Sequence, residues 1–333
     1  MRIIVTGATG FVGTEIVGKL TAKNHDVYQI GFSKVEPQTS GGNVFKVDIT
    51  DLNSVLELKR LKEIDVIIHS AGLAHQFGKI EKEKFWKTNI DGTKNILELA
   101  VILRVKHFIL ISSTAIYGTQ KKKGTAVGVM DENALCIPQT IYAESKLEAE
   151  RQAREICERN NIDLTIFRLA PVIGEKNAGN VQRMIEAIDK GRFIWIGKGE
   201  NYKSLIDKAD VAGACEKVIR NKKNGTEIFN LAAEPILMHD FVREAARNLE
   251  RRIPNFSISP MLLDRIFRLN DNVFKIDKIT KIAVTIEKWL SDDIYPASKF
   301  ELEYDFKAKI SIPEALKRQI SWYREQADIK GRR

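Results

Sequence analysis

The chain is poor in the residues that cross-link a fold or bind metals. Its 333 residues include three cysteines, and Cys136, Cys157 and Cys215 are too scattered to suggest a disulfide framework or a zinc site. The five histidines form no cluster, so we predict no metal site. No apolar run approaches the ~20 residues of a membrane-spanning helix, and no signal sequence precedes the first predicted strand. We therefore expect a cytoplasmic protein without an integral membrane segment.

The net charge of +9 comes from 53 lysines and arginines against 44 acidic residues. Basic residues cluster only at residues 121–123 and at the C-terminal end, without interleaved aromatic residues, so we predict no nucleic-acid partner. Solvated surface lysine is the interpretation we favour for this charge, while attraction to anionic substrates or to a membrane surface is the alternative.

A glycine-rich turn near the N-terminus carries the first functional signal. Residues 2–6 are apolar and predict a buried strand, and residues 10–23 predict a helix with one apolar face. Between them Gly7, Gly10 and Gly13 are spaced three residues apart. A strand, a tight glycine turn and a helix place backbone N–H groups and the positive end of the helix against a pyrophosphate. The segment therefore predicts a dinucleotide site.

Predicted strands and helices alternate along the first half of the chain. The expected strands are residues 2–6, 27–30, 44–47, 66–69, 107–112 and 164–168, and the expected helices are residues 10–23, 51–62, 84–104 and 141–159. This order predicts an α/β fold with a Rossmann-type, doubly wound parallel sheet. We assign residues 1–171 to a dinucleotide-binding domain and 172–333 to a smaller, mostly helical substrate-binding region. Strand 227–231 is expected to return to the main sheet.

The pattern Tyr-x-x-x-Lys occurs three times, and one copy has the context that catalysis needs. Tyr142 and Lys146 open a predicted helix that follows the strand ending near Ser113. The copy at Tyr117 runs into a predicted loop, and the copy at Tyr295 contains a proline. A tyrosine has a pKa of ~10, which must fall by roughly 3 for the phenol to act as a base near neutral pH.

Lys146, one helical turn away, favours the phenolate, and Ser113 would hydrogen-bond the substrate oxygen. We predict Ser113, Tyr142 and Lys146 as catalytic residues that oxidise an alcohol or reduce a ketone with NAD(P).

Together these motifs resemble the extended short-chain dehydrogenase/reductases, in the NAD-dependent epimerase/dehydratase family that includes UDP-galactose 4-epimerases. Similar segments are residues 66–73, 89–93, 112–118 and 321–323. The resemblance implies these cofactor-binding residues: Gly7, Thr9, Gly10, Phe11, Val12, Gly13, Ser33, Lys34, Asp48, Ile49, Ser70, Ala71, Gly72, Asn89, Tyr142, Lys146, Pro171 and Val172. It also implies a homodimer formed through helices 84–104 and 141–159. For this contact we expect surplus apolar surface at Ile96, Leu97, Leu99, Ala100 and Leu103.

Departures from the family pattern limit which reactions and substrates the chain is expected to have. Family dehydratases place Asp-Glu after the catalytic Ser or Thr, whereas this chain has Thr114 and Ala115, which argues against dehydration. Pro171 replaces a usual asparagine, and Lys203 stands where an arginine clamps the diphosphate. The predicted substrate-binding residues are Leu73, His75, Thr114, Asn180, Arg183 and Lys203. For Asn180 and Arg183, a helix cap and a solvated side chain are the alternatives.

Two regions bear on the choice between NAD and NADP and on the kind of substrate, and each allows an alternative. The second strand ends at Gly31 without a carboxylate, and Ser33 and Lys34 follow, so we expect NADP(H) preference, with equal use of both cofactors as the alternative. Residues 254–290 include a strongly apolar helix that carries Met261, Leu262, Leu263, Ile266, Phe267 and Leu269. We expect it to be buried core, and contact with a membrane or a prenyl-linked substrate is the alternative.

The leading hypothesis is an NAD(P)-dependent oxidoreductase or epimerase acting on a hydroxyl or ketone, at C4, of a nucleotide-linked sugar. The alternatives are an NADPH-dependent reductase of an apolar, steroid-like alcohol or ketone and an epimerase of a lipid-linked sugar. A cofactor-binding regulatory protein on the same fold is a third class. The set Ser113, Tyr142 and Lys146 argues against that class, because a sensor needs no proton transfer.

Overall fold

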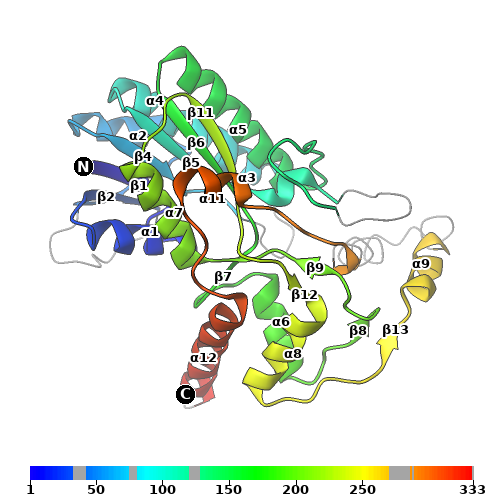
Figure 1. Ribbon diagram of the computed structural model, residues 1–333. Helices are drawn as coiled ribbons and strands as arrows, with labels where there is room; N and C mark the ends of the chain where they lie inside the picture. The colour runs from blue at the N-terminus through cyan, green and yellow to red at the C-terminus, as the bar shows by residue number, and fades with distance from the viewer. Residues whose placement is uncertain (33–42, 75–80, 120–127, 270–285, 287–288, 332–333) are drawn as a thin grey trace.

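The structure is a computed structural model, and it describes residues 1–32, 43–74, 81–119, 128–269, 286 and 289–331. Figure 1 shows a central sheet between helices, with a second, mostly helical region below it. Ser33, Lys34 and His75, all predicted to bind cofactor or substrate, lie outside the described residues.

The central sheet has seven strands, all parallel, in the order β11-β6-β5-β4-β1-β2-β3. The strands are β1 (Arg2–Thr6), β2 (Asp26–Gly31), β3 (Asn43–Lys46), β4 (Val66–His69), β5 (His107–Ser113), β6 (Asp163–Leu169) and β11 (Thr226–Leu231). The predicted Rossmann-type sheet is confirmed, and so is the return of strand 227–231, which pairs with β6. From β1 the chain adds strands first on one side of the sheet (β2 and β3) and then on the other (β4, β5 and β6). Ligands of such folds bind at this switch point, between β1 and β4.

Two helical layers cover the sheet because neighbouring strand residues face opposite sides. Ile3 and Val5 of β1 belong to a core with Ile16 of the first layer, whereas Ile4 belongs to a core with Leu97 of the second. The first layer consists of α1 (Phe11–Thr21), α7 (Lys208–Arg220) and α11 (Ser298–Tyr304). The second consists of α2 (Leu52–Leu56), the 3₁₀ turn η1 (Glu57–Arg60), α4 (Gly92–Ile102) and α5 (Ile141–Arg159).

Two predicted helices differ from the observed ones. Residues 51–62 form α2 and a 3₁₀ turn instead of one helix. Residues 84–104 are divided into α3 (Lys82–Phe85), a π-helical turn η2 (Trp86–Asp91) and α4. The wider π turn places Asn89 inside the protein, and such turns are frequent at functional sites. Helix α5 has the predicted bounds, because the Thr140 hydroxyl caps its first turn by accepting from the Ala143 N–H at 3.1 Å.

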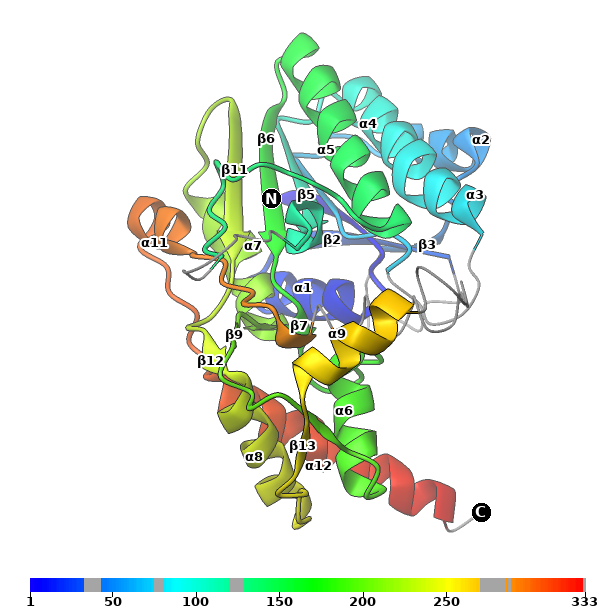
Figure 2. The same ribbon diagram turned by 90° about the vertical axis from the view of Figure 1, so that its right-hand side faces the viewer.

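The C-terminal region contains a third apolar core between α6, α8 and α12, which includes Met184, Phe241 and Leu316. Figure 2 shows these three helices packed below the sheet. Besides α7, β11 and α11, the C-terminal region contains β7 (Val172–Ile173), α6 (Asn180–Asp189), β8 (Trp195–Ile196), β9 (Tyr202–Lys203), β10 (Ile206–Asp207), β12 (Ile236–Leu237), α8 (Met238–Leu249), β13 (Ser257–Ile258), α9 (Pro260–Leu269) and α12 (Ile312–Gly331).

Two expectations about apolar surface were wrong. The side chains expected to leave a surplus on helix 84–104 are covered by the chain itself, because α2 and α5 flank α4. Four of them are fully buried and Leu103 is half-buried: Ile96, Leu97, Leu99 and Ala100. Conversely, Met261 and Leu262 of α9 are not core, because they are 75% and 54% exposed, whereas Leu263 and Phe267 of the same helix are half-buried.

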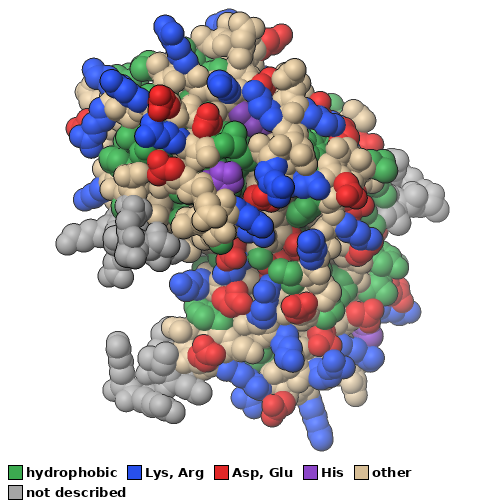
Figure 3. All heavy atoms as spheres, turned by 60° about the vertical axis from the view of Figure 1, so that its left-hand side comes forward, with side chains coloured by type: hydrophobic (Ala, Val, Ile, Leu, Met, Phe, Trp, Pro, Cys, Tyr) green, Lys and Arg blue, Asp and Glu red, His purple; other side chains and the backbone are tan. Residues whose placement is uncertain are grey.

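The described residues hold no helix long and apolar enough to cross a membrane. Within the same residues no group of histidine, cysteine, aspartate and glutamate side chains could hold a metal ion. Basic and acidic side chains are interspersed over the face shown in Figure 3, which agrees with solvated surface charge.

Candidate active site

The glycine turn between β1 and α1 has the geometry of an anion cradle. Gly7 has a φ of +67°, and a Cβ there would lie 2.7 Å from the Ala71 nitrogen. A Cβ on Gly13 would overlap the Gly7 carbonyl oxygen. Helix α1 begins after Gly10, and no side chain caps its first N–H groups. The turn therefore admits only glycine at these places and leaves helix N–H donors for a diphosphate. Thr9 lies in the same turn, and Phe11 and Val12 are the first two residues of α1.

Other predicted cofactor residues lie at the carboxyl ends of the neighbouring strands. Asp48 follows β3 by two residues, and its Oδ1 accepts from the backbone N–H and the hydroxyl of Thr50 at 2.9 and 2.8 Å. Ile49 packs so closely that a Cβ on Gly92 would meet it at 2.8 Å. Two further stretches follow β4 and β6: Ser70, Ala71 and Gly72, then Pro171 and Val172. Parallel strands bring these loops to one edge of the sheet.

The structure brings the three predicted catalytic side chains together. Ser113 ends β5, and its hydroxyl lies near the Tyr142 phenol of α5. Burial raises the pKa of Tyr142, and the nearby Ser113 hydroxyl partly opposes that rise. Lys146, one turn further along α5, donates from Nζ to the Ile111 carbonyl at 2.6 Å. Burial lowers the pKa of Lys146 to about 8, against the opposite effect of the Glu150 carboxylate.

Asn89 links the loop after β4 to the catalytic helix. Its Oδ1 accepts from the Leu73 N–H at 2.7 Å, and its Nδ2 donates to the Ser145 hydroxyl at 2.9 Å. Ser145 in turn donates to the Tyr142 carbonyl at 2.8 Å. A Cβ on Gly72 would lie 3.9 Å from the Lys146 amine. These bonds fix the predicted cofactor loop against the first turn of α5.

His69 is a structural member of the core. The buried Thr6 hydroxyl bonds to its Nδ1 at 2.8 Å, and its Nε2 bonds to Thr93 at 3.0 Å. Because Thr93 donates to the Asn89 carbonyl at 2.6 Å, it accepts from His69, which fixes the Nε2–H tautomer. Burial lowers the pKa of His69 to about 3, so the ring is neutral.

A buried ion pair behind the catalytic helix was missed at the sequence level. The Arg168 guanidinium of β6 donates to Glu150 Oε2 at 2.9 Å, with the two side chains 3% and 1% exposed. The Ser112 hydroxyl donates to Glu150 Oε1 at 2.5 Å. Two signals were available in the sequence. Glu150 shares a helical face with Lys146, and Arg168 is a lone charge in an apolar strand.

Arg168 also donates a hydrogen bond to the Tyr117 phenol at 3.0 Å, and this phenol donates to the Asn230 side chain at 2.8 Å. Tyr117 is fully buried and its ring stacks on Tyr295 at 5.9 Å between centroids. Both tyrosines are therefore parts of the core, which agrees with setting aside the other two Tyr-x-x-x-Lys copies.

The predicted substrate residues fall into two groups. Asn180 and Arg183 are exposed on the first turn of α6, whose cap is Gly179, so Asn180 is not the cap. Lys203 and Thr114 already have protein partners. Lys203 Nζ donates to Asp293 and to the Ser291 carbonyl, both at 2.8 Å. Thr114, 2% exposed, donates to the Leu169 carbonyl at 3.2 Å. Their contact with substrate stays a prediction.

Asn177, which the sequence analysis did not single out, shapes the loop before α6. This buried side chain donates to the Val172 carbonyl and accepts from the Gly179 N–H at 2.5 Å. Both partners lie within five residues, so the contact is local. An asparagine close to a glycine before a predicted helix was the available signal.

Comparison with known proteins gives one family. The model of the NAD dependent epimerase/dehydratase family matches residues 3–232. An Escherichia coli O157:H7 N-acetyl-alpha-D-glucosaminyl-diphospho-ditrans,octacis-undecaprenol 4-epimerase is 28% identical over 264 residues, 77% of this chain and 75% of its own. A Vibrio cholerae UDP-glucose 4-epimerase is 27% identical over 255 residues, 75% and 76% of the two chains. The structure of Thermotoga maritima UDP-glucose 4-epimerase with UDP-glucose shares the fold, with a TM-score of 0.77, 22% identity and coverage of 98% and 100%.

We predict that Arg168→Leu lowers the free energy of unfolding by about 3 kcal/mol, because the buried Glu150 carboxylate then keeps only the Ser112 hydroxyl and, at 3.9 Å, the partly exposed Arg154 guanidinium. Arg151→Leu is the matched control. Arg151 pairs with Glu148 on the same helix, but its side chain is 66% exposed, so about 0.5 kcal/mol or less is expected. Urea denaturation of the two variants measures both values.

The double variant Glu150→Leu and Arg168→Leu should recover most of the loss, because both charges are removed together. Equal losses in the Arg168 and Arg151 variants would contradict the importance of the buried pair.

Proposed function

The chain belongs to the NAD-dependent epimerase/dehydratase family, and from this premise we propose that it is a cytoplasmic 4-epimerase or 4-ketoreductase of a nucleotide-linked sugar. The observation that carries the proposal is the group of Ser113, Tyr142 and Lys146 at the carboxyl edge of the sheet, beside a glycine cradle. The group supplies proton transfer, and the cradle fits a dinucleotide diphosphate.

Each side chain has a separate task in this proposal. Gly7, Gly13 and the first turn of α1 would hold NAD(P), whose nicotinamide would supply the hydride chemistry. Ser113 would hydrogen-bond the reacting sugar oxygen, and Tyr142 would take or return its proton. The Lys146 amine is mostly charged at neutral pH, since its pKa is about 8, and its charge favours the Tyr142 phenolate.

The residues after Ser113 support epimerisation or reduction over dehydration. Dehydration of a sugar needs an acid and a base that act on the ring carbons. Thr114 and Ala115 offer neither, and the Thr114 hydroxyl is engaged with the Leu169 carbonyl.

A lipid-linked sugar is the second candidate substrate. The printed name of the E. coli relative specifies a sugar linked through diphosphate to undecaprenol. The exposed Met261 and Leu262 of α9 would suit such an apolar carrier. A reductase of apolar, steroid-like ketones is the remaining alternative, with the same proton-transfer residues.

We predict that Tyr142→Phe lowers turnover by about 10²- to 10⁴-fold, because it removes only the oxygen that exchanges the proton. The measurement is interconversion or reduction of UDP-linked sugars with NAD(P), with the products separated by chromatography. Tyr304→Phe is the matched control, because the Tyr304 hydroxyl is buried without a hydrogen-bond partner in the described part of the chain. Its turnover should equal that of the wild type.

Near-normal turnover of Tyr142→Phe would overturn the mechanism. Mass spectrometry of ligand that co-purifies with the protein tests the substrate class separately. A nucleotide sugar is expected there, and a steroid-like compound would favour the reductase alternative.

We propose that NADP(H) is preferred over NAD(H). Strand β2 ends at Gly31, which is buried, so no carboxylate at this position repels a 2′-phosphate. Ser33 and Lys34 follow in the sequence and offer a hydroxyl donor and a cation. A preference for NADP(H) favours the ketoreductase, because epimerases of this family keep NAD bound through a closed cycle.

The expected result is a lower dissociation constant for NADPH than for NADH, measured by fluorescence titration. Lys34→Ala should weaken NADPH binding and leave NADH binding unchanged. Tighter binding of NADH that is insensitive to Lys34→Ala would return the 4-epimerase to first place.

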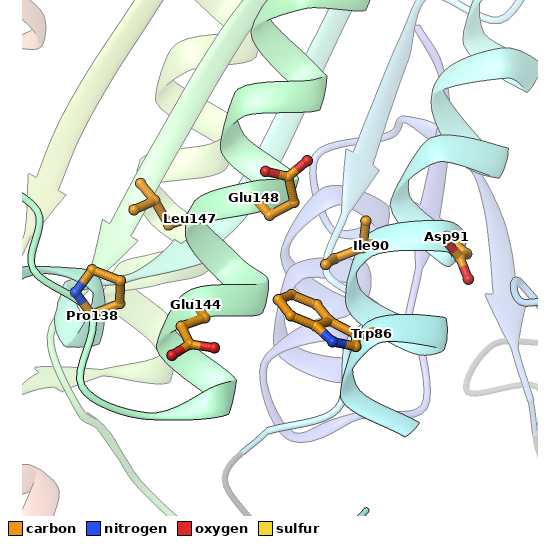
Figure 4. A pocket seen from close by; sticks show the side chains of 7 residues that line it. All are labelled: Trp86, Ile90, Asp91, Pro138, Glu144, Leu147 and Glu148. Atoms are coloured by element: carbon orange, nitrogen blue, oxygen red, sulfur yellow. The ribbon is translucent and has the colours of Figure 1, made fainter. Parts of the chain in front are cut away.

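We also propose a homodimer through η2 and α5. Figure 4 shows Trp86 and Ile90 of η2 beside α5, and these two side chains and Leu147 of α5 line a groove of about 490 Å³. Acidic side chains, Glu144 and Glu148 among them, lie along the same groove. A second copy that presents the same two helices would cover these apolar side chains in a twofold arrangement.

Trp86→Glu should therefore convert the protein to a monomer, because it places a charge among acidic residues in the contact. Light scattering at micromolar concentration should give twice the chain mass for the wild type and the single mass for the variant. A wild-type monomer would contradict the proposal.

A further inference from the structure

Four large apolar side chains are exposed in one small part of the C-terminal region. Ile194 is 48% exposed, Phe256 64%, Met261 75% and Leu262 54%. Single exposed apolar residues are ordinary, but a contiguous group marks a contact site. These four residues, which we call the apolar tip, belong to β8, β13 and α9 or directly precede them.

The strand pairing makes the tip contiguous. Parallel strands β8 and β13 pair with Ser257 opposite Trp195, so the preceding residues Phe256 and Ile194 lie beside each other. Helix α9 begins two residues after β13, where the Leu262 N–H bonds to the Ser259 carbonyl at 3.1 Å. In Figures 1 and 2 the segment lies on the side of the molecule that the carboxyl ends of the sheet strands face.

Exposed basic residues lie in the same segments of the chain as the tip. Arg192 and Lys198 flank β8, Arg252 precedes β13, and Arg265 lies one helical turn beyond Met261; all four are exposed. Among the charged residues of these segments the acidic ones are fewer. Glu200 is exposed, Asp189 is paired with Arg251 at 3.1 Å and Glu250 with Arg324 at 3.5 Å, and Asp264 directly precedes Arg265 in the sequence of α9.

We propose that the apolar tip binds the surface of an anionic lipid bilayer. The apolar side chains would enter the boundary between headgroups and acyl chains, while the arginine and lysine side chains reach the lipid phosphates. A second copy of the chain fits less well, because the tip would meet its own positive charge across a twofold axis. The proposal goes beyond the proposed function and does not depend on which sugar is the substrate.

Co-sedimentation of the full chain with vesicles tests the proposal. Vesicles of phosphatidylglycerol mixed with phosphatidylcholine should bind the protein, and pure phosphatidylcholine vesicles should bind it more weakly. The double variant Met261→Glu and Leu262→Glu should lower the partition coefficient by about tenfold or more, since it removes the inserted groups. Arg265→Gln should lower it about fivefold.

Leu302→Glu is the matched control, because Leu302 is 85% exposed on α11, away from the tip, and its binding should not change. Unchanged thermal midpoints would show that the variants remain folded. Absence of binding to anionic vesicles would overturn the proposal, and so would equal binding by the double variant and the wild type. A loss of self-association in the double variant, without any vesicle binding, would identify a second copy as the occupant and also overturn it.

Discussion

The buried ion pair between Glu150 and Arg168 is the constraint that holds the candidate active site in place. Glu150 lies one turn beyond Lys146 on α5, and Arg168 lies on β6, so the pair fixes the catalytic helix to the sheet. Ser112, which bonds to the same carboxylate, directly precedes Ser113. A buried pair of this kind contributes little net stability, because desolvation offsets the attraction. Its effect is positional, since removing either partner leaves a charge in the core.

Much of the fold could be predicted from the sequence because local signals agreed with one another. The strand at residues 2–6 and the glycine turn followed from apolar runs and glycine spacing, and the bounds of α5 followed from a run of residues that favour helix. The return of strand 227–231 to the sheet was also predictable, since a short run that contains residues favouring β-strands follows a helix there. In each case the interactions that fix the element lie within a few residues or follow the rule for parallel crossovers.

The rest depends on contacts between distant parts of the chain. The π turn at Trp86–Asp91 exists where Asn89 meets Leu73 and Ser145, and neither partner is close to it in sequence. The sequence shows that α4 carries apolar residues on more than one face, but it could not show that α2 and α5 cover them. The exposure at the start of α9 was misjudged for the converse reason, because an amphipathic pattern does not reveal what lies opposite it.

The ion pair also explains how a carboxylate can stand beside a site that must favour a phenolate. Glu150 supports the charge on Lys146, yet an uncompensated carboxylate at that place would oppose a negative Tyr142. Arg168 removes the conflict by donating to the same carboxylate, so the local charge is dominated by the Lys146 amine. That amine is held by the Ile111 carbonyl, a neutral acceptor, and keeps its positive charge. The arrangement thus leaves a buried cation one turn from Tyr142, where the proposed mechanism needs positive charge to offset the rise that burial gives to the pKa of the phenol.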